Sequence, residues 1–285
     1  MHRPYLAHPV RVRIPIGVLA CFGSIVLAAA AAVAYPGGTP SYQTDVAPFC
    51  SGCHSSISPA ALAGAGERAE KEVAERKHIS VILSGQKGYA SLSEADRKTL
   101  ADQIRALDEA STVAIEAPAS VAPGQTFEVK VSVTGGAGPV VGVALVDSDH
   151  RWYARPASSA GWTIAAPPQI TGADGQPRNG WLDKRPEERG RNLSFVNVPG
   201  ISSDSAAAKW DSATVVFQVT APSRPGSYPL AAAFWYGTEK STLLGYKTNA
   251  MGRKEVRGGL TGGSGRVAFT GVSNIEVKPA PAPQP

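Results

Sequence analysis

Residues 126–133, Thr-Phe-Glu-Val-Lys-Val-Ser-Val, decide the fold class of most of this chain. Phenylalanine or valine stands at every second position from Phe127 to Val133, with one polar residue between each pair. Side chains alternate between the two faces of a β-strand, so this spacing places all the apolar ones on one face. An amphipathic helix would need them three or four residues apart. The segment therefore predicts a half-buried strand.

Similar strand patterns follow at residues 140–146, 213–219, 228–236, 265–270 and 273–277. Turn signals separate them, at Pro123-Gly124, Gly135-Gly136, Pro225-Gly226 and Gly262-Gly263. Many short strands between such turns favour an all-β sandwich over residues 112–278, followed by a Pro-rich tail at 279–285. Two turns that lead straight into strands, Pro-Gly-Gln-Thr-Phe and Pro-Gly-Ser-Tyr, resemble immunoglobulin-like and fibronectin-like modules. That resemblance concerns architecture and does not imply a function.

Residues 43–110 have a different composition, rich in Ala, Glu and Lys. Their apolar spacing predicts three helices, one beginning near Asp45, one over residues 67–84 and one beginning at Ser93, which is a good N-cap. The change from helical to period-two spacing places a domain boundary at residues 109–111. This upstream unit is too short to bury a large core without help.

The upstream unit contains Cys50-Ser51-Gly52-Cys53-His54, which is the attachment motif for c-type haem. Each thiol adds across one vinyl group of the porphyrin, and the adjoining imidazole then binds the iron. The alternatives are a structural disulfide, half a zinc site and a thioredoxin-like redox pair. A zinc site would need further Cys or His ligands at suitable spacing, and a thioredoxin-like pair would need a βαβ pattern around it. Neither is present in the sequence.

The upstream unit resembles the class I cytochrome c family over about a quarter of the chain. The resemblance rests on three stretches: Phe49-Cys50-Ser51-Gly52-Cys53-His54, Ile79-Ser80-Val81-Ile82-Leu83-Ser84-Gly85 and Leu92-Ser93-Glu94. It implies one covalent haem c, with Cys50 and Cys53 as thioether anchors and His54 as the proximal ligand of the iron. The expected fold class is therefore multidomain α + β: a small all-α cytochrome c domain followed by an all-β immunoglobulin-like sandwich with a long insertion.

The distal iron ligand departs from that family. Such cytochromes usually present a methionine before the last helix, but residues 86–91 contain none. His78 is the first candidate, because on a helix it would share an apolar face that should turn toward the haem. Lys87 and Tyr89 lie nearest the usual methionine position, and Met251 is an alternative from the second domain. A five-coordinate or water-bound iron is also open, and His78 could equally be a solvated or hydrogen-bonded histidine.

The first 34 residues have the features of a secretory signal. Three arginines precede an uncharged run, and the segment ends in Ala32-Val33-Ala34, an A-x-A-like cleavage pattern. An uncleaved membrane anchor over residues 14–34 is the alternative. Removal of the signal would leave 25 basic and 23 acidic residues. The net charge would then fall from +5 for the full chain to +2. This near-neutral balance does not indicate nucleic-acid binding. We expect a periplasmic protein that begins with a short linker at residues 35–42.

The expected insertion lies between about Asp147 and Trp210 and is rich in Trp, Tyr and Arg. These residue types anchor protein interfaces, so one hypothesis is a docking surface for a redox partner. The other hypothesis, which we favour, is that the tryptophans pack the insertion onto the sandwich and the charges are solvated. Asp147, Asp149 and His150 only weakly suggest a metal site, because a polar turn explains them equally well.

The function expected from the sequence is single-electron transfer by an exported monohaem c-type cytochrome, with the sandwich docking an unidentified redox protein. No enzyme motif such as GxSxG or a P-loop is present at a strand-to-helix junction. The alternative is a haem that binds or senses a small ligand, or a redox enzyme subunit, with an open or weakly ligated distal position. A third possibility is a surface or assembly protein in which the haem unit is accessory.

Overall fold

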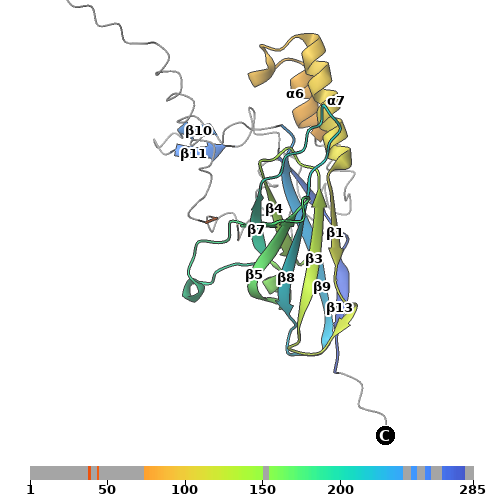
Figure 1. The fold of residues 1–285 in the computed structure, drawn as a ribbon, viewed down its shortest axis with the longest axis vertical. Helices are drawn as coiled ribbons and strands as arrows, with labels where there is room; N and C mark the ends of the chain where they lie inside the picture. Colours follow the sequence, from red (N-terminus) through yellow and green to blue (C-terminus); the bar gives the residue numbers. More distant parts are fainter. Residues whose placement is uncertain are drawn as a thin grey trace, which may run out of the picture. The chain divides into compact units, whose positions relative to one another are not determined.

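The computed structural model describes residues 38, 39, 44, 74–149, 154–239, 245–248, 254–257 and 265–279. Strands are the commonest regular element among them, and nearly all of these strands belong to two β-sheets (Figure 1). The first sheet has five strands, in the order β1 (Thr112–Glu116), β3 (Thr126–Thr134), β8 (Ser212–Thr220), β5 (Thr163–Gly172) and β6 (Pro177–Arg178). The second has six: β2 (Ser120–Val121), β13 (Ser273–Val277), β9 (Gly226–Gly237), β4 (Val140–Val146) and β7 (Phe195–Pro199) in that order, with β12 (Gly265–Phe269) paired to β9. The strands β10 (Gly245–Thr248) and β11 (Lys254–Arg257) form a two-stranded ladder.

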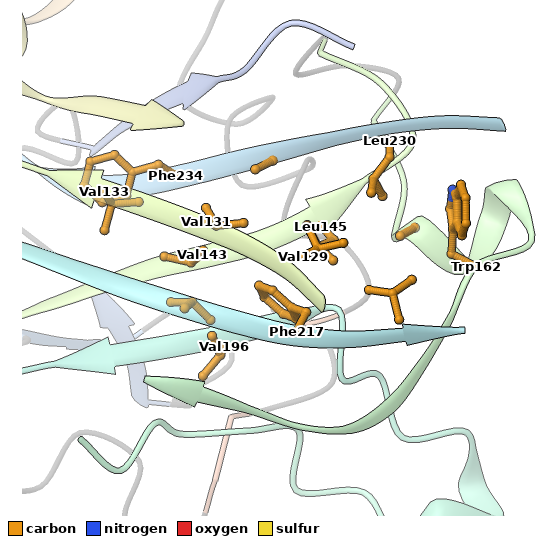
Figure 2. Close-up of a cluster of buried hydrophobic side chains, with 14 of the residues drawn as sticks. Val129, Val131, Val133, Val143, Leu145, Trp162, Val196, Phe217, Leu230 and Phe234 are labelled. Carbon is orange, nitrogen blue, oxygen red and sulfur yellow. The ribbon is translucent and has the colours of Figure 1, made fainter. Parts of the chain in front are cut away.

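The two sheets pack face to face through one hydrophobic core, shown in Figure 2. The five-stranded sheet contributes Val129 and Phe217, and the six-stranded sheet contributes Val143, Leu145 and Phe234; all five are fully buried. Burial of one such side chain contributes about 1.5–3 kcal/mol relative to leaving it exposed. The predicted strand at residues 126–133 is confirmed as β3, and the five strands predicted downstream of it are confirmed as β4, β8, β9, β12 and β13.

The described helical segments lie between residues 75 and 110. A π-helical turn, η2 (Glu75–Ile79), continues into α6 (Ser80–Leu83); a 3-10 turn, η3 (Lys87–Tyr89), and the helix α7 (Glu94–Ala110) follow. Further 3-10 turns, η4 (Ala157–Ala160) and η5 (Glu187–Arg189), lie among the strands. The predicted N-cap is confirmed, because the Ser93 hydroxyl oxygen accepts the Asp96 N–H at 3.2 Å.

The C-terminal end of α7 is tied to the sandwich. The Ser111 hydroxyl donates to the Leu107 carbonyl at 2.7 Å and accepts the Gly136 N–H at 3.0 Å. Ser111 also presses against Gly135, whose φ of +89° and lack of a Cβ both favour glycine at this close approach. The change from helix to strand thus occurs at one buried serine.

The expected division into an all-α domain and an all-β domain is wrong. Strand predominates in the described residues, and the described part of residues 43–110 forms no all-α domain of its own. The hydrophobic cluster among its helices is small and consists of Ile79, Ile82, Tyr89, Ala101 and Ile104. Such a cluster is too small to stabilise a separate fold, and the buried polar residues beside it find their partners on β9, β12 and the residues that follow β9.

The expected long insertion is also wrong, because three strands from it, β5, β6 and β7, are integral to the sheets. β5 pairs with β8, and β7 pairs with β4. Pro167 and Pro168 lie within β5, where two register shifts interrupt the ladder, so the strand lacks a clean alternation in sequence. Trp162, just before β5, is buried and donates its indole N–H to the Pro229 carbonyl at 2.9 Å.

Within the described residues, no helix is both long enough and apolar enough to cross a membrane.

Candidate functional site

Four of the five predicted haem-site residues, Cys50, Cys53, His54 and Met251, lie outside the described residues. The predicted haem attachment therefore stays a prediction. Of the described residues, no group of three or more His, Cys, Asp or Glu side chains is arranged to hold a metal ion. His78 is the fifth predicted site residue, and its surroundings are fully described.

His78 lies in η2 with its side chain 1% exposed. Its Nε2 is 2.8 Å from Oε1 of Glu239 and 3.0 Å from the hydroxyl of Tyr89. The Tyr89 hydroxyl in turn donates to the same Glu239 oxygen at 2.5 Å. The other ring nitrogen, Nδ1, is 3.1 Å from Nη2 of Arg266. His78 thus joins the helical segment to the end of β9 and to β12, rather than lying on an open surface.

The hydrogen bond to Arg266 decides where the proton of His78 lies. A guanidinium can only donate, so Nδ1 must accept, and the proton of the neutral ring is on Nε2, which donates to Glu239. An iron ligand needs a free lone pair on one ring nitrogen. In this arrangement one lone pair is used by Arg266 and the other nitrogen carries the proton. Coordination through His78 would therefore require the ring to leave Arg266 or Glu239, and distal ligation stays a prediction.

A carboxylate at the end of α7 completes this buried group, which we call the junction cluster (His78, Tyr89, Asp108, Tyr236, Glu239 and Arg266). Asp108 accepts the Tyr236 hydroxyl at 3.1 Å and Nε of Arg266 at 3.1 Å. The Arg266 side chain is 8% exposed. Its positive charge is paired with Asp108 and also acts on the nearby Glu239 carboxylate, which offsets much of the cost of removing these charges from water.

The carboxylates of the junction cluster differ in their pKa shifts. Burial tends to raise the pKa of Glu239, but hydrogen bonds from His78 and Tyr89 and the nearby positive charge outweigh it, so the pKa is lowered. For Asp108, burial is the larger effect, so its pKa is raised despite Arg266 and Tyr236. Burial beside Asp108 also raises the pKa of Tyr236. Tyr236 therefore acts as a hydrogen-bond donor and stays protonated at neutral pH.

Sequence reasoning missed Asp108, Tyr236, Glu239 and Arg266. Glu239 is 161 residues from His78 and Arg266 is 188 residues from it. Local spacing holds no signal for such pairs. Of the other distal-ligand candidates, Tyr89 is buried against Glu239, and Lys87 is exposed with a positive φ of 56°.

A second polar group contains Thr39 and Thr44, the described residues that precede the haem motif. We call this group the strap anchor, and its members are Thr39, Thr44, Asp183, Arg185, Asn192 and Asn197. The buried carboxylate of Asp183 accepts the Thr44 hydroxyl at 2.9 Å and the Asn192 N–H at 3.1 Å. It also accepts the Arg185 backbone N–H at 2.8 Å and pairs with the Arg185 guanidinium. Burial alone would raise the pKa of Asp183, but these donors lower it to about 2.

The strap anchor also adds backbone to the edge of the six-stranded sheet. Trp181 bridges Asn197 of β7 in antiparallel fashion, and Thr39 bridges Asp183 in parallel fashion. The Asn197 side chain donates to the Thr39 hydroxyl at 2.9 Å. Thr44 stands six positions before Cys50 in the sequence. Thr39 and Thr44, which precede the haem motif in the sequence, are therefore attached to the chain segment that borders β7.

The expected docking surface is partly used for internal packing. Trp162 belongs to the core, and Arg185 pairs with Asp183. Arg191 donates to the Asp183 carbonyl at 3.1 Å, although Lys184 and Arg189 remain exposed. Asp147, considered for a metal site, accepts the Arg155 N–H at 2.7 Å.

Comparison with known proteins returned no matches: no protein-family model matches the chain, and no curated protein matches it. The resemblance to class I cytochromes c therefore depends on the quoted sequence motifs alone.

Proposed function

We propose that this chain is an exported c-type cytochrome that carries one haem and transfers single electrons in the periplasm. The observation that carries the proposal is Cys50-Ser51-Gly52-Cys53-His54 after a signal-like segment. Cys50 and Cys53 would form the two thioethers, and His54 would bind the iron. The bound haem would accept one electron from a donor protein and pass it to an acceptor.

The described residues support a scaffold role for the sandwich in this function. The strap anchor fixes Thr44 on a rigid sheet edge six residues before Cys50, and the junction cluster fixes His78. The described residues on both sides of the haem motif are thus attached to the sandwich. Exposed Lys184 and Arg189 lie beside the strap anchor and offer positive charge to an acidic redox partner.

The test is to produce the protein in a host that attaches haem and to measure its mass and optical spectrum. We expect one haem that survives denaturation, and its loss in a variant carrying both Cys50→Ser and Cys53→Ser. A wild-type protein with no added mass would refute the proposal. A reversible one-electron titration distinguishes a carrier from a haem with no accessible redox couple.

A second candidate function is the binding of a small ligand such as carbon monoxide, nitric oxide or oxygen at the distal side of the haem. Two observations favour it: residues 86–91 hold no methionine, and the lone pair of His78 is used by Arg266. Rapid binding of carbon monoxide to the ferrous protein would support this candidate. A six-coordinate spectrum that carbon monoxide leaves unchanged would support the carrier.

A further inference from the structure

The chain contains five asparagines, and Asn179 is the one that is followed by glycine. An asparagine loses its side-chain amide most readily in that context, because a glycine has no Cβ to hinder attack by its backbone nitrogen. Asn197 and Asn274 are followed by valine and isoleucine, whose branched side chains crowd the same nitrogen. Asn192 is followed by leucine. The sequence therefore marks Asn179-Gly180 as the place where this reaction meets least resistance.

The fold leaves the Asn179-Gly180 pair free to react. Asn179 is exposed and lies between β6 and Trp181, outside any helix or strand. Within the described part of the chain, neither the Asn179 side chain nor the Gly180 N–H makes a hydrogen bond. No hydrogen bond must therefore break before the Gly180 nitrogen can reach Cγ of Asn179.

The other described asparagines are held by the fold. The Asn192 side chain donates to the Thr44 carbonyl at 2.6 Å. Asn197 is buried within β7, and Asn274 lies within β13. Reaction at any of these three positions would have to break a hydrogen bond or distort a strand.

We propose that Asn179-Gly180 is a site of spontaneous backbone modification, at which the asparagine becomes isoaspartate. The Gly180 nitrogen attacks Cγ of Asn179, so that a new N–Cγ bond forms and the bond from Cγ to the side-chain nitrogen breaks. That nitrogen leaves as ammonia and takes the proton of the Gly180 N–H with it. Water then opens the five-membered imide. Cleavage at the main-chain carbonyl carbon gives isoaspartate, whose backbone runs through Cβ and Cγ, and cleavage at Cγ gives aspartate.

Isoaspartate would lengthen the backbone by one methylene between two fixed neighbours. On one side, Arg178 pairs with Ile170 of β5 and donates to the Gly200 carbonyl at 2.6 Å. On the other side, the Trp181 N–H donates to the Asn197 carbonyl at 2.9 Å, and the Asn197 N–H donates to the Trp181 carbonyl at 3.1 Å. The pairing of Trp181 with Asn197 is an isolated bridge, so it should give way before the ladder of β5 and β6.

Gly180 itself has no room to absorb the extra length. A Cβ at this position would lie 2.3 Å from Cδ1 of Ile170 and 2.5 Å from Cγ2 of Val196, and both side chains belong to the core. The strain should therefore pass to Trp181. Because the Thr39 hydroxyl donates to the Trp181 carbonyl at 2.7 Å, the modification should also loosen the strap anchor.

The test is to age the full-length protein in mildly alkaline buffer and to follow the loss of amide nitrogen at each asparagine by peptide mapping with mass spectrometry. An isoaspartyl methyltransferase, which methylates isoaspartate but not aspartate, identifies the product. We expect loss at Asn179 to be at least about tenfold faster than at Asn192 or Asn274, which corresponds to about 1.4 kcal/mol in activation free energy. Equal rates at the three positions, or loss at Asn179 only after unfolding in urea, would overturn the proposal.

Two variants show that the product comes from this pair. Asn179→Gln should abolish the isoaspartate, because a glutamine side chain would have to close a larger ring. Asn274→Gln is the matched control and should leave the rate at Asn179 unchanged. Isoaspartate that persists in the Asn179→Gln protein would place the modification elsewhere and contradict the assignment.

The structural consequence has its own measurement. In the isoaspartate-containing fraction, hydrogen exchange should show a loss of protection at the amides of Trp181 and Asn197. Asn179→Asp adds the same charge on an ordinary backbone and should keep that protection. Equal protection in the two proteins would trace any change to the charge rather than to the longer backbone, and would refute the proposed loosening.

Discussion

Replacing one buried carboxylate should release the chain that leads to the haem motif. The side chain of Asp183 is fully buried, and one of its oxygens, Oδ2, accepts from Thr44, Arg185 and Asn192. Asp183→Asn keeps the shape but replaces one oxygen with an amide donor and removes the charge. Both oxygens of Asp183 accept hydrogen bonds. Whichever way the asparagine amide is turned, its NH2 group therefore faces at least one N–H donor of Arg185 or Asn192. We expect a loss of about 2–3 kcal/mol, the usual cost of one orphaned donor and a weakened charged hydrogen bond.

The pH dependence of this loss provides a second, independent check. The pKa of Asp183 is about 2 in the folded protein against an ordinary value of 3.8. A lowered pKa means that the ionised carboxylate stabilises the folded state above pH 3.8, and that this contribution is lost as the pH falls toward 2. The shift corresponds to about 2 kcal/mol at most, and to about 1 kcal/mol after allowing for the partly exposed Arg185. The difference in stability between the wild-type protein and the variant should therefore narrow by about 1 kcal/mol at low pH.

Urea unfolding at pH 7 and at pH 2.5 measures the free-energy difference, and hydrogen exchange of residues 38–44 reports the local release. Asp102→Asn is the matched control, because Asp102 is 60% exposed and forms a single surface ion pair with Arg105. That change should cost less than about 0.5 kcal/mol. Equal losses in the two variants, or a difference for Asp183→Asn that does not shrink with falling pH, would refute the reasoning.

Three further changes probe the junction and the sheets. Glu239→Gln should lower the free energy of unfolding by about 1–3 kcal/mol in urea titrations, because the charged acceptor of the buried His78 N–H is lost. Gly142→Ala should cost about 1–3 kcal/mol in the same assay, because the new Cβ would lie 2.9 Å from Cζ of Phe195; Gly265→Ala, with open space around it, should be nearly neutral. Ile104→Ala, at a side chain 1% exposed, should cost about 2–4 kcal/mol in thermal unfolding, and a loss below 1 kcal/mol would mean that the helical cluster is loosely packed.

The strands that could be predicted are those whose information is local. β3 and β8 alternate strictly, because one face of each meets the core and the other is polar. β5 escaped prediction because prolines and register shifts break its alternation. β7 escaped because it is buried on both faces and its outward residue Asn197 is polar. A short apolar run of this kind cannot be assigned from its period alone.

The candidate site is even harder to predict from local sequence patterns than the strands are. The sequence singles out Cys50, Cys53 and His54 because their chemistry depends on residues that are adjacent in the chain. His78 was singled out for its apolar helical face, and burial of that face is confirmed. Its partners Glu239 and Arg266 come from the far end of the chain. No local pattern marks them, so the role of His78 as a junction residue emerges only from the fold.

The junction cluster and the strap anchor together argue against a helical unit that can be detached from the sandwich. Residues 74–110 alone would keep Asp108 and His78 but lose Tyr236, Glu239 and Arg266, leaving buried polar groups without partners. The apolar cluster around Ile104 is too small to compensate for that loss. The chain before the haem motif would also lose Asp183. A sandwich serving only to dock a partner would need none of these contacts, so we expect its closer role to be anchoring the described residues on both sides of the haem motif.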